Sequence, residues 1–229
     1  MSTAQRPKPS AHRPHGERHE WCDSGVAAMF QDAGACCRAM PDRSALTAGR
    51  WVIDPVHSRV RFAVRRRGLA PLRARFTSIS GHLETSGDPP GSSVELVVAT
   101  ASIVSGSTGC DLRAAEQLDV ARHPTATFRA RSTSWAGGLA RFRGCLTIVG
   151  VTNEVALDVD IRGTVVDPSL AARIMFSTAF SIDRESWGLS WNVTLADGRA
   201  LVERIVDLEL ELEAARQSAP STSSDTGRH

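Results

Sequence analysis

Apolar and polar residues alternate along most of the chain between Trp51 and Ala215. The alternation is clearest in residues 203–216, ERIVDLELELEAAR, where every second residue from 206 to 212 is valine or leucine and the residues between them are acidic. Successive side chains of a strand point to opposite faces. The pattern therefore predicts a β-strand with one apolar and one charged face.

Further stretches of the chain repeat this period of two and predict about eight long strands joined by short turns. They are residues 59–65, 73–85, 92–103, 125–135, 140–150, 151–166 and 173–183. Gly137 and Gly138 predict a tight hairpin between two of these strands. Phe128 and Phe142 lie on the two strands of that hairpin, and we expect a cross-strand contact between them. Gly81 predicts a bulge or bend.

One interior segment, residues 109–124, lacks the alternation. Its Leu112, Ala115 and Leu118 recur at helical spacing and predict a short helix that crosses one end of the sheet. Many long strands with a single helix indicate a sandwich or a closed antiparallel barrel, and closure is favoured because no protected edge is apparent. We therefore predict an all-β, eight-stranded antiparallel barrel. The lumen of such a barrel is either filled by side chains or holds one ligand, and periodicity does not choose between these two.

The two ends of the chain differ in composition from the barrel domain, which we place at residues 49–215. Residues 1–48 are rich in Pro, His, Arg, Ser and Ala and predict a flexible segment with at most one short helix. Residues 216–229 are polar and predict a disordered tail. Because Met40 would be a sensible start for the domain, one hypothesis is that residues 1–39 are not native.

Charge and composition exclude several classes of partner. The net charge is +2, aromatic content is 5% and tyrosine is absent, so we expect no nucleic-acid partner. No apolar run reaches the roughly 18 residues of a membrane span. No basic patch precedes an apolar run, so we expect a cytoplasmic protein, with export as the alternative. The five cysteines include no CxxC pair, which favours reduced thiols. A homodimer is compatible with all of these observations.

The sequence contains none of the common catalytic or cofactor-binding motifs. A P-loop, GxSxG, HExxH and a GxGxxG after a strand are all absent. We therefore predict a protein without enzymatic activity and without a cofactor. The alternative is an enzyme that acts on a bound lipid, with His57 or His123 as its base, although each is interpreted first as a structural or turn residue.

A second alternative lies in the N-terminal segment. It is an interaction or metal-binding module made by clustered residues of the types that bind zinc, namely His12, His15, His19, Cys22, Cys36 and Cys37. Their spacing matches no zinc finger, and the two adjacent cysteines strain tetrahedral chelation. We therefore predict no metal.

An arginine cluster surrounds the connection RRRGLAPLRAR at residues 65–75. A charge run of this kind is usually a solvated loop. The functional interpretation is an anion clamp at a barrel mouth, because guanidinium groups pair with phosphate in a bidentate way. On that interpretation Arg65, Arg67 and Arg73 would bind a pyrophosphate head group.

Four stretches, in this order, together resemble one known family. They are WVIDPVHSRVRFAV, LDVARHPTATF, FRGCLTIVGVTNEVALDVDI and IDRESWGLSW. They are similar to motifs of the YceI-like, polyisoprenoid-binding proteins, and the resemblance runs from about Arg50 to Ala215. The chain departs from the family pattern at TGCDLRA, where relatives tend to carry Arg-Asp and then His-Leu. It also departs in lacking a clear export signal.

The resemblance implies an elongated, lipocalin-like barrel of eight antiparallel strands with a small helix. It also implies a lumen that holds a polyisoprenoid, an isoprenoid quinone or a similar amphiphilic lipid, for carriage, storage or stress protection. The expected lining is aromatic, with one polar candidate at the first turn. These candidates are Phe62, Phe76, Phe128, Phe142, Phe176, Phe180, Trp187, Trp191 and His57.

Overall fold

The computed structural model describes residues 48–86, 91–136, 138–165 and 172–217. The predicted flexible segment, apart from Ala48, lies outside these residues together with its histidines and cysteines, as does most of the predicted C-terminal tail. The strands are β1 (Gly49–Ile53), β2 (Arg59–Arg66), β3 (Leu69–Phe76), β4 (Ile79–Thr85), β5 (Ser93–Ala99), β6 (Ile103–Val104), β7 (Thr125–Ala136), β8 (Leu139–Ile148), β9 (Val151–Val165), β10 (Arg173–Asp183) and β11 (Val202–Arg216). The helices are the α-helix α1 (Thr108–Gln117) and the short 3-10 helices η2 (Thr100–Ser102) and η3 (Arg184–Trp187).

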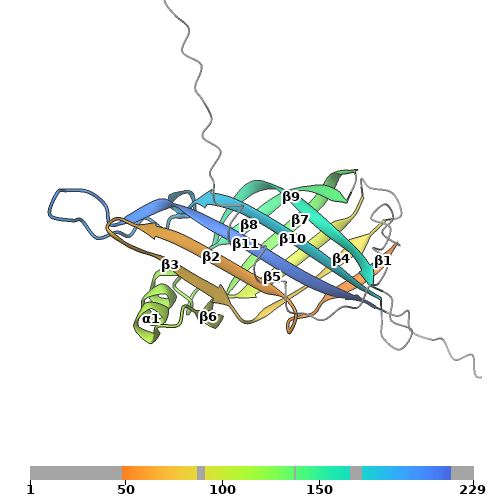
Figure 1. Ribbon diagram of the computed structural model, residues 1–229, viewed down its shortest axis with the longest axis horizontal. Helices are drawn as coiled ribbons and strands as arrows, with labels where there is room; N and C mark the ends of the chain where they lie inside the picture. The colour runs from red at the N-terminus through yellow and green to blue at the C-terminus, as the bar shows by residue number, and fades with distance from the viewer. Residues whose placement is uncertain (1–47, 87–90, 137, 166–171, 218–229) are drawn as a thin grey trace, which may run out of the picture. The chain divides into compact units, whose positions relative to one another are not determined.

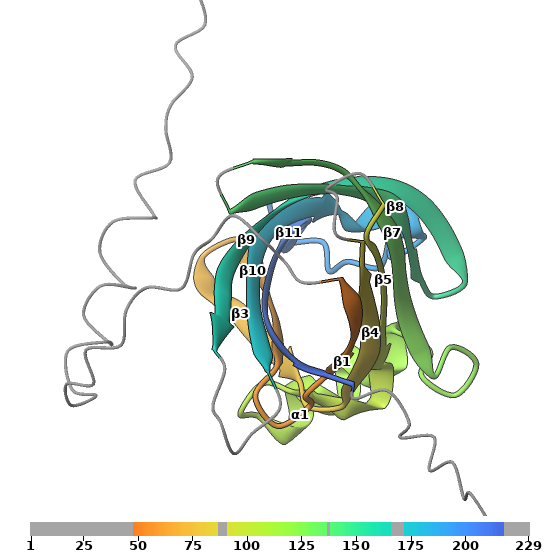
Figure 2. The same cartoon turned by 90° about the vertical axis from the view of Figure 1, so that its right-hand side faces the viewer.

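The strands form one closed antiparallel barrel, seen nearly end-on in Figure 2. The barrel has eight long strands, and three of them are each divided by one interruption into two shorter strands. These divided strands are β1 with β2, β3 with β4, and β5 with β6. The long strand β11 closes the ring, because it pairs with β1 near its C-terminal end and with β2 along the rest of its length. The prediction of an eight-stranded antiparallel barrel with one α-helix is confirmed (Figure 1).

Two glycines allow adjacent strands to approach closely. A Cβ atom at Gly81 would lie 2.2 Å from the carbonyl oxygen of Glu95, and one at Gly144 would lie 2.0 Å from that of Arg129. The register between β4 and β5 continues without a break through Gly81, which pairs with Leu96. The prediction of a bulge at Gly81 is therefore wrong, because the glycine is needed for close backbone contact rather than for an inserted residue.

The outer face of the barrel carries cross-strand ion pairs. Arg61 contacts Glu209 at 3.1 Å and Glu211 at 2.7 Å, and Arg129 contacts Glu95 at 2.8 Å. Exposed pairs of this kind contribute little stability singly. They do show that the acidic residues of β11 point outward, which leaves the valine and leucine positions between them for the lumen.

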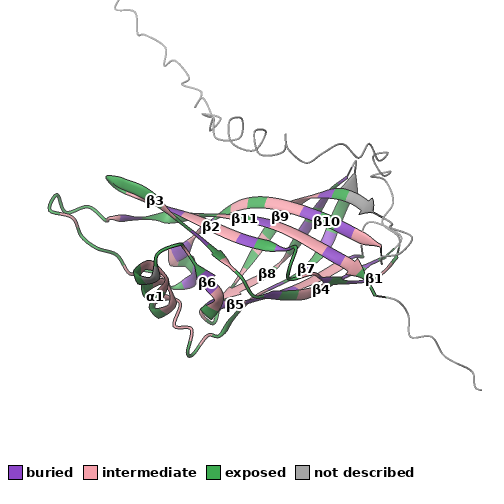
Figure 3. Ribbon diagram, turned by 60° about the horizontal axis from the view of Figure 1, so that its bottom comes forward, coloured by how far each residue is buried: buried purple, intermediate pink, exposed green. Residues whose placement is uncertain are grey.

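The two ends of the barrel differ in packing. At the end formed by β1 and β4, the Trp51 side chain is 0% exposed, and its Nε1 donates a hydrogen bond to Thr85 Oγ1 at 3.0 Å. At the opposite end, α1 carries only half-buried and exposed residues among those whose burial is described, and the beginning of β3 is exposed (Figure 3). We call these the closed end and the mouth end. In the part of the chain that the structure describes, no helix has the length and apolarity that crossing a bilayer requires.

Candidate functional site

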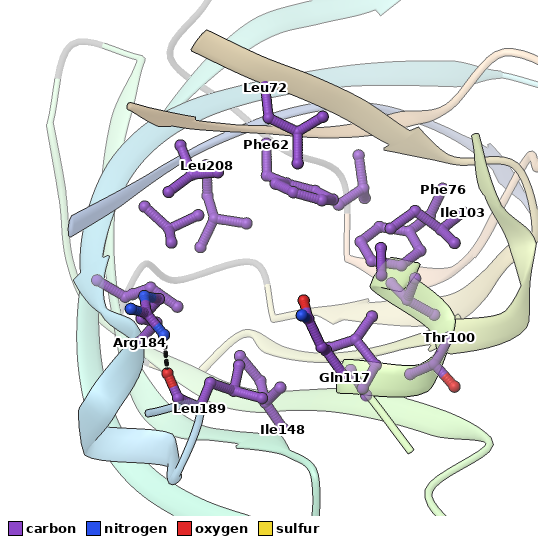
Figure 4. A pocket seen from close by; sticks show the side chains of 18 of the residues that line it. Phe62, Leu72, Phe76, Thr100, Ile103, Gln117, Ile148, Arg184, Leu189 and Leu208 are labelled. Atoms are coloured by element: carbon purple, nitrogen blue, oxygen red, sulfur yellow. Dashed lines mark hydrogen bonds between the residues drawn. The ribbon is translucent and has the colours of Figure 1, made fainter. Parts of the chain in front are cut away.

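A cavity of about 570 Å³ occupies the mouth half of the lumen. Side chains from β2, β3, β5, β7, β10, β11 and α1 line it together with the segment that follows η3. The volume lies within the range of ordinary small-molecule sites. Most of the wall is apolar, and Figure 4 shows Phe62, Leu72, Phe76 and Leu208 around the space.

The hollow forms where β5 gives way to helix. The buried Thr100 in η2 donates its hydroxyl to the carbonyl oxygen of His123 at 2.7 Å and so joins the two ends of the excursion that contains α1. Helix α1 contributes small and polar residues to the cavity wall, including Ala114 and Gln117. The predicted apolar stripe does not face inward as a whole, because Leu112 is 64% exposed.

A layer of four side chains separates the cavity from the closed end. Leu96, Phe128, Leu157 and Leu210 line both the cavity and a second void of about 50 Å³ beneath it. We call these four residues the floor. Leu96 and Phe128 lie directly opposite each other on paired strands. A ligand that enters from the mouth end would end its path at this layer.

Five of the predicted aromatic residues line the main cavity. They are Phe62, Phe76, Phe128, Phe180 and Trp191. The Phe62 and Phe76 rings contact each other, with centroids 5.8 Å apart. Phe142 and Phe176 line only the small void below the floor. They belong to the packed part of the lumen.

Two expectations about aromatic residues differ from the structure. Trp187 is 4% exposed and lines neither space, because its Nε1 donates to the carbonyl oxygen of Leu146 at 3.0 Å within the wall. Phe128 pairs with Leu146, whereas Phe142 pairs with Ser132. The expected pairing of the two phenylalanines is wrong, because the hairpin register displaces them by several residues.

His57 lies away from the cavity, in the turn after β1 at the closed end. Its Nδ1 lies 2.9 Å from Asp54 Oδ2. Arg173 donates to Asp54 Oδ2 at 2.7 Å and to Glu213 Oε1 at 2.5 Å. The Arg173 guanidinium, followed by the His57 hydrogen bond, holds the pKa of the Asp54 carboxyl well below its ordinary value.

The same turn brings together three potential metal ligands, Asp54, His57 and Glu213, whose ligand atoms lie within 4.8 Å of one another. The Arg173 guanidinium bonds both carboxylates and already supplies the positive charge that a cation would bring. The geometry is therefore that of an ion-pair network that joins the closing strands.

The arginines proposed as a head-group clamp do not line the cavity. Arg65 and Arg67 are exposed, and Arg73 lines a separate groove with Arg61 and Glu209. The alternation of β2 explains why Arg65 and Arg67 point away from the cavity. Arg66 is in phase with the inward Phe62 and Val64, whereas Arg65 and Arg67 are not. Arg66 lines the cavity and donates to the carbonyl oxygen of Ala70 from two nitrogens, at 3.0 and 2.8 Å.

Sequence reasoning missed the most buried charged group in the cavity wall, Arg184. Its side chain belongs to η3, which the Asp183 carboxylate caps by accepting from the backbone N–H of Glu185 at 3.1 Å. Arg184 is 2% exposed, and its guanidinium carbon lies 5.0 Å from the centroid of the Trp191 ring. No strand periodicity marks this position, because it follows the last paired residue of β10.

The fold and much of the sequence match known proteins. Residues 51–214 match the family model described as YceI-like domain. A UPF0312 protein from Azotobacter vinelandii is 30% identical over 176 residues, which cover 74% of this chain and 88% of the relative.

Two solved structures share the fold. The first is BcnA from Burkholderia cenocepacia, with a TM-score of 0.59 and 20% identity over 71% of this chain and 99% of that one. The second is a polyisoprenoid binding domain from Saccharophagus degradans, with a TM-score of 0.58 and 17% identity over 75% of this chain and all (100%) of that one. From the barrel, its cavity and the match across most of the described residues, we conclude that this chain belongs to the YceI-like family.

Proposed function

We propose that this protein binds a long apolar amphiphile in its lumen and releases it unchanged, as a carrier or store. Polyisoprenoids, isoprenoid quinones and similar lipids are the ligand class. The observation that carries the proposal is the cavity of about 570 Å³, whose walls are largely apolar and which ends at the floor. The polyisoprenoid-binding domain with the same fold supports it.

Apolar burial alone supplies enough free energy for useful affinity. Each buried methylene contributes about 0.8 kcal/mol, so one five-carbon unit contributes roughly 3–4 kcal/mol before ordering costs. Several units would therefore bind without any reactive group and with few hydrogen bonds. Tail length would be limited by the depth of the cavity down to the floor.

Binding is favoured over catalysis by the positions of the two candidate bases. Neither His57 nor His123 is among the cavity-lining residues. The alternative of an N-terminal interaction or metal-binding module concerns residues outside those described. A cytoplasmic location stays a prediction.

Titration calorimetry with geraniol, farnesol and geranylgeraniol tests the proposal. We expect affinity to rise with each added isoprene unit and to level off once the tail reaches the floor. Saturable binding of none of the three alcohols would contradict the proposal.

A lumen-blocked variant, Ala126→Trp with Leu208→Trp, provides the matched comparison. The strands β7 and β11 lie four places apart in the ring of eight, on opposite walls. Both substituted residues lie two positions toward the mouth from floor residues, Phe128 and Leu210. We expect this variant to lose binding. The outward control, Ala156→Trp with Ala179→Trp, adds the same two indoles at exposed positions of β9 and β10 and should bind as the wild type does.

A further inference from the structure

We propose that Arg184 is an anion-binding anchor in the cavity wall, and that it makes the protein select lipids with a carboxylate or phosphate head group over uncharged lipids with the same tail. This inference rests on the proposed lipid-binding function and specifies the ligand class. It also moves the head-group site from the exposed arginines of the β2–β3 connection to the inside of the barrel. Figure 4 shows Arg184 among the lining side chains, across the cavity from Gln117.

The hydrogen bonds of the Arg184 guanidinium leave one nitrogen unused. Nε donates to the carbonyl oxygen of Glu203 at 3.1 Å, and Nη1 donates to that of Leu189 (Figure 4). Nη2 is buried and has no hydrogen-bond partner. A buried donor without a partner costs free energy, and the cost is larger for a charged group. A ligand oxygen at Nη2 would remove that cost.

The acidic neighbours of Arg184 are already engaged elsewhere. Asp183 and Glu185 both pair with Arg204, whose Nε lies 2.9 Å from Glu185 Oε2 and whose Nη2 contacts Asp183 Oδ2. Among the described residues, no carboxylate forms an ion pair with Arg184. The burial of this cation lowers its pKa from the ordinary value, which is the signature of a charge deprived of water without full compensation.

The rest of the cavity wall also favours an anion. Its described lining includes the arginines Arg66, Arg113 and Arg184 but no Asp or Glu. A negative head group would therefore meet only positive side-chain charge, in surroundings where apolar walls weaken dielectric screening. Trp191 covers one side of the Arg184 guanidinium and holds it in place.

The position of Arg184 suits a ligand with a head and a tail. It contacts the backbone of Glu203 in β11, seven residues before the floor residue Leu210 in the same strand. At about 3.3 Å per residue, the path along the strand is roughly 23 Å. A head group at Arg184 would therefore leave the apolar length of the cavity free for the tail.

Two matched lipid pairs test the assignment in the full-length protein. Oleate is compared with oleyl alcohol, and geranylgeranyl phosphate with geranylgeraniol, by titration calorimetry. We expect the wild-type protein to bind at least one charged member about tenfold or more tightly than its uncharged partner, as a charge-assisted hydrogen bond would give. A preference within the first pair assigns a carboxylate ligand, and one within the second pair assigns a phosphate ligand.

Variants locate the preference. Arg184→Met should reduce the ratio of affinities to within about twofold, and Arg184→Lys, which keeps the charge, should retain an intermediate ratio. The control Arg199→Met removes the same charge from an exposed side chain that does not line the cavity and lies two positions before the lining residue Leu201, and it should leave the ratio unchanged. The wild-type comparison stands even where Arg184→Met does not fold.

Equal affinities within both pairs in the wild-type protein would overturn the assignment and leave lipid binding intact. A preference that survives Arg184→Met would overturn it as well. Binding of none of the four lipids would instead contradict the proposed function itself.

Discussion

The closed end and the mouth end of the barrel are built from the same strands with the same alternation, yet one is packed and the other is hollow. At the closed end Trp51, Phe142 and Ile174 fill the lumen, and Ala140 and Ala214 are fully buried among them. At the mouth end, Phe62, Phe76 and Leu208 face a cavity of about 570 Å³. Both arrangements thus require apolar residues that point inward, and the presence of such residues does not determine whether a region of the lumen is packed or hollow.

Side-chain volume and strand continuity account for the difference. The closed end receives the indole of Trp51, the largest fully buried side chain. At the mouth end, β5 is interrupted by η2, and the chain then leaves the barrel wall to form α1. The short helix contributes small residues such as Gly109 and Ala114 where a continuous strand would have contributed a regular row. The hollow therefore lies where the chain makes this excursion from the barrel wall.

Removal of one phenyl ring from each region should give the largest contrast in stability. We expect Phe142→Ala to lower the free energy of unfolding by about 3–5 kcal/mol, because it opens a cavity in packed surroundings. Phe76→Ala enlarges a space that already exists and should cost about 1–2 kcal/mol. Chemical denaturation monitored by tryptophan fluorescence measures both. Equal losses would show that the mouth end is as tightly packed as the closed end.

Added volume should give the opposite contrast. Ala140 is 0% exposed, and Ala140→Leu should cost about 1–3 kcal/mol because the extra atoms must displace their neighbours. Leu208→Trp directs a larger side chain into the cavity and should change stability by less than about 1 kcal/mol. Thermal unfolding of both variants tests the difference. A Leu208→Trp protein less stable than Ala140→Leu would contradict a hollow lumen.

The ion-pair network of the closed end should contribute a smaller, pH-dependent amount. Because the pKa of Asp54 is lowered in the folded state from an ordinary value of 3.8, its charge stabilises the fold above that value, and the contribution declines as the pH falls below it. Asp54→Asn should therefore cost about 1–2 kcal/mol at pH 7. The deficit relative to wild type should shrink below about pH 4. Urea denaturation between about pH 3 and about pH 7 measures the upper part of this decline, because the folded-state pKa lies well below the ordinary value.

The control for this prediction is Asp158→Asn, because Asp158 pairs with Arg141 on the exposed surface at 3.0 Å. We expect it to change stability by less than about 0.5 kcal/mol at any of these pH values. A pH-independent effect of Asp54→Asn would show that the loss arises from packing rather than from the charge.

The barrel could be predicted from the sequence because the alternation of apolar and polar residues in strands such as β11 indicates which residues face inward. The eight long strands, the hairpin near Gly138 and the helix α1 all follow from such local signals. The site could be predicted only in part. Phe62 and Phe180 lie at inward positions of their strands, as the alternation predicts. Trp187 lies beyond the end of β10, where alternation no longer applies, and its side chain packs into the wall.

The head-group site shows where local pattern fails. Arg65 and Arg67 were predicted to bind the head group because they belong to a run of charged residues. Both are exposed, because they alternate with the inward residues of β2. Arg184 is a single arginine in a 3-10 turn, and its burial depends on Trp191 and on the backbone of Glu203, which no periodic pattern connects to it. The volume of the cavity likewise depends on how side chains from eight strands together fill the lumen. It therefore cannot be predicted from the sequence of any single segment.

Native mass spectrometry of the protein after incubation with geranylgeraniol tests the central claim most directly. We expect one bound lipid per wild-type chain, retained in the Ala156→Trp/Ala179→Trp control and absent from the lumen-blocked Ala126→Trp/Leu208→Trp variant. A wild-type chain that carries no lipid, or a lumen-blocked variant that carries as much lipid as the wild type, would contradict it.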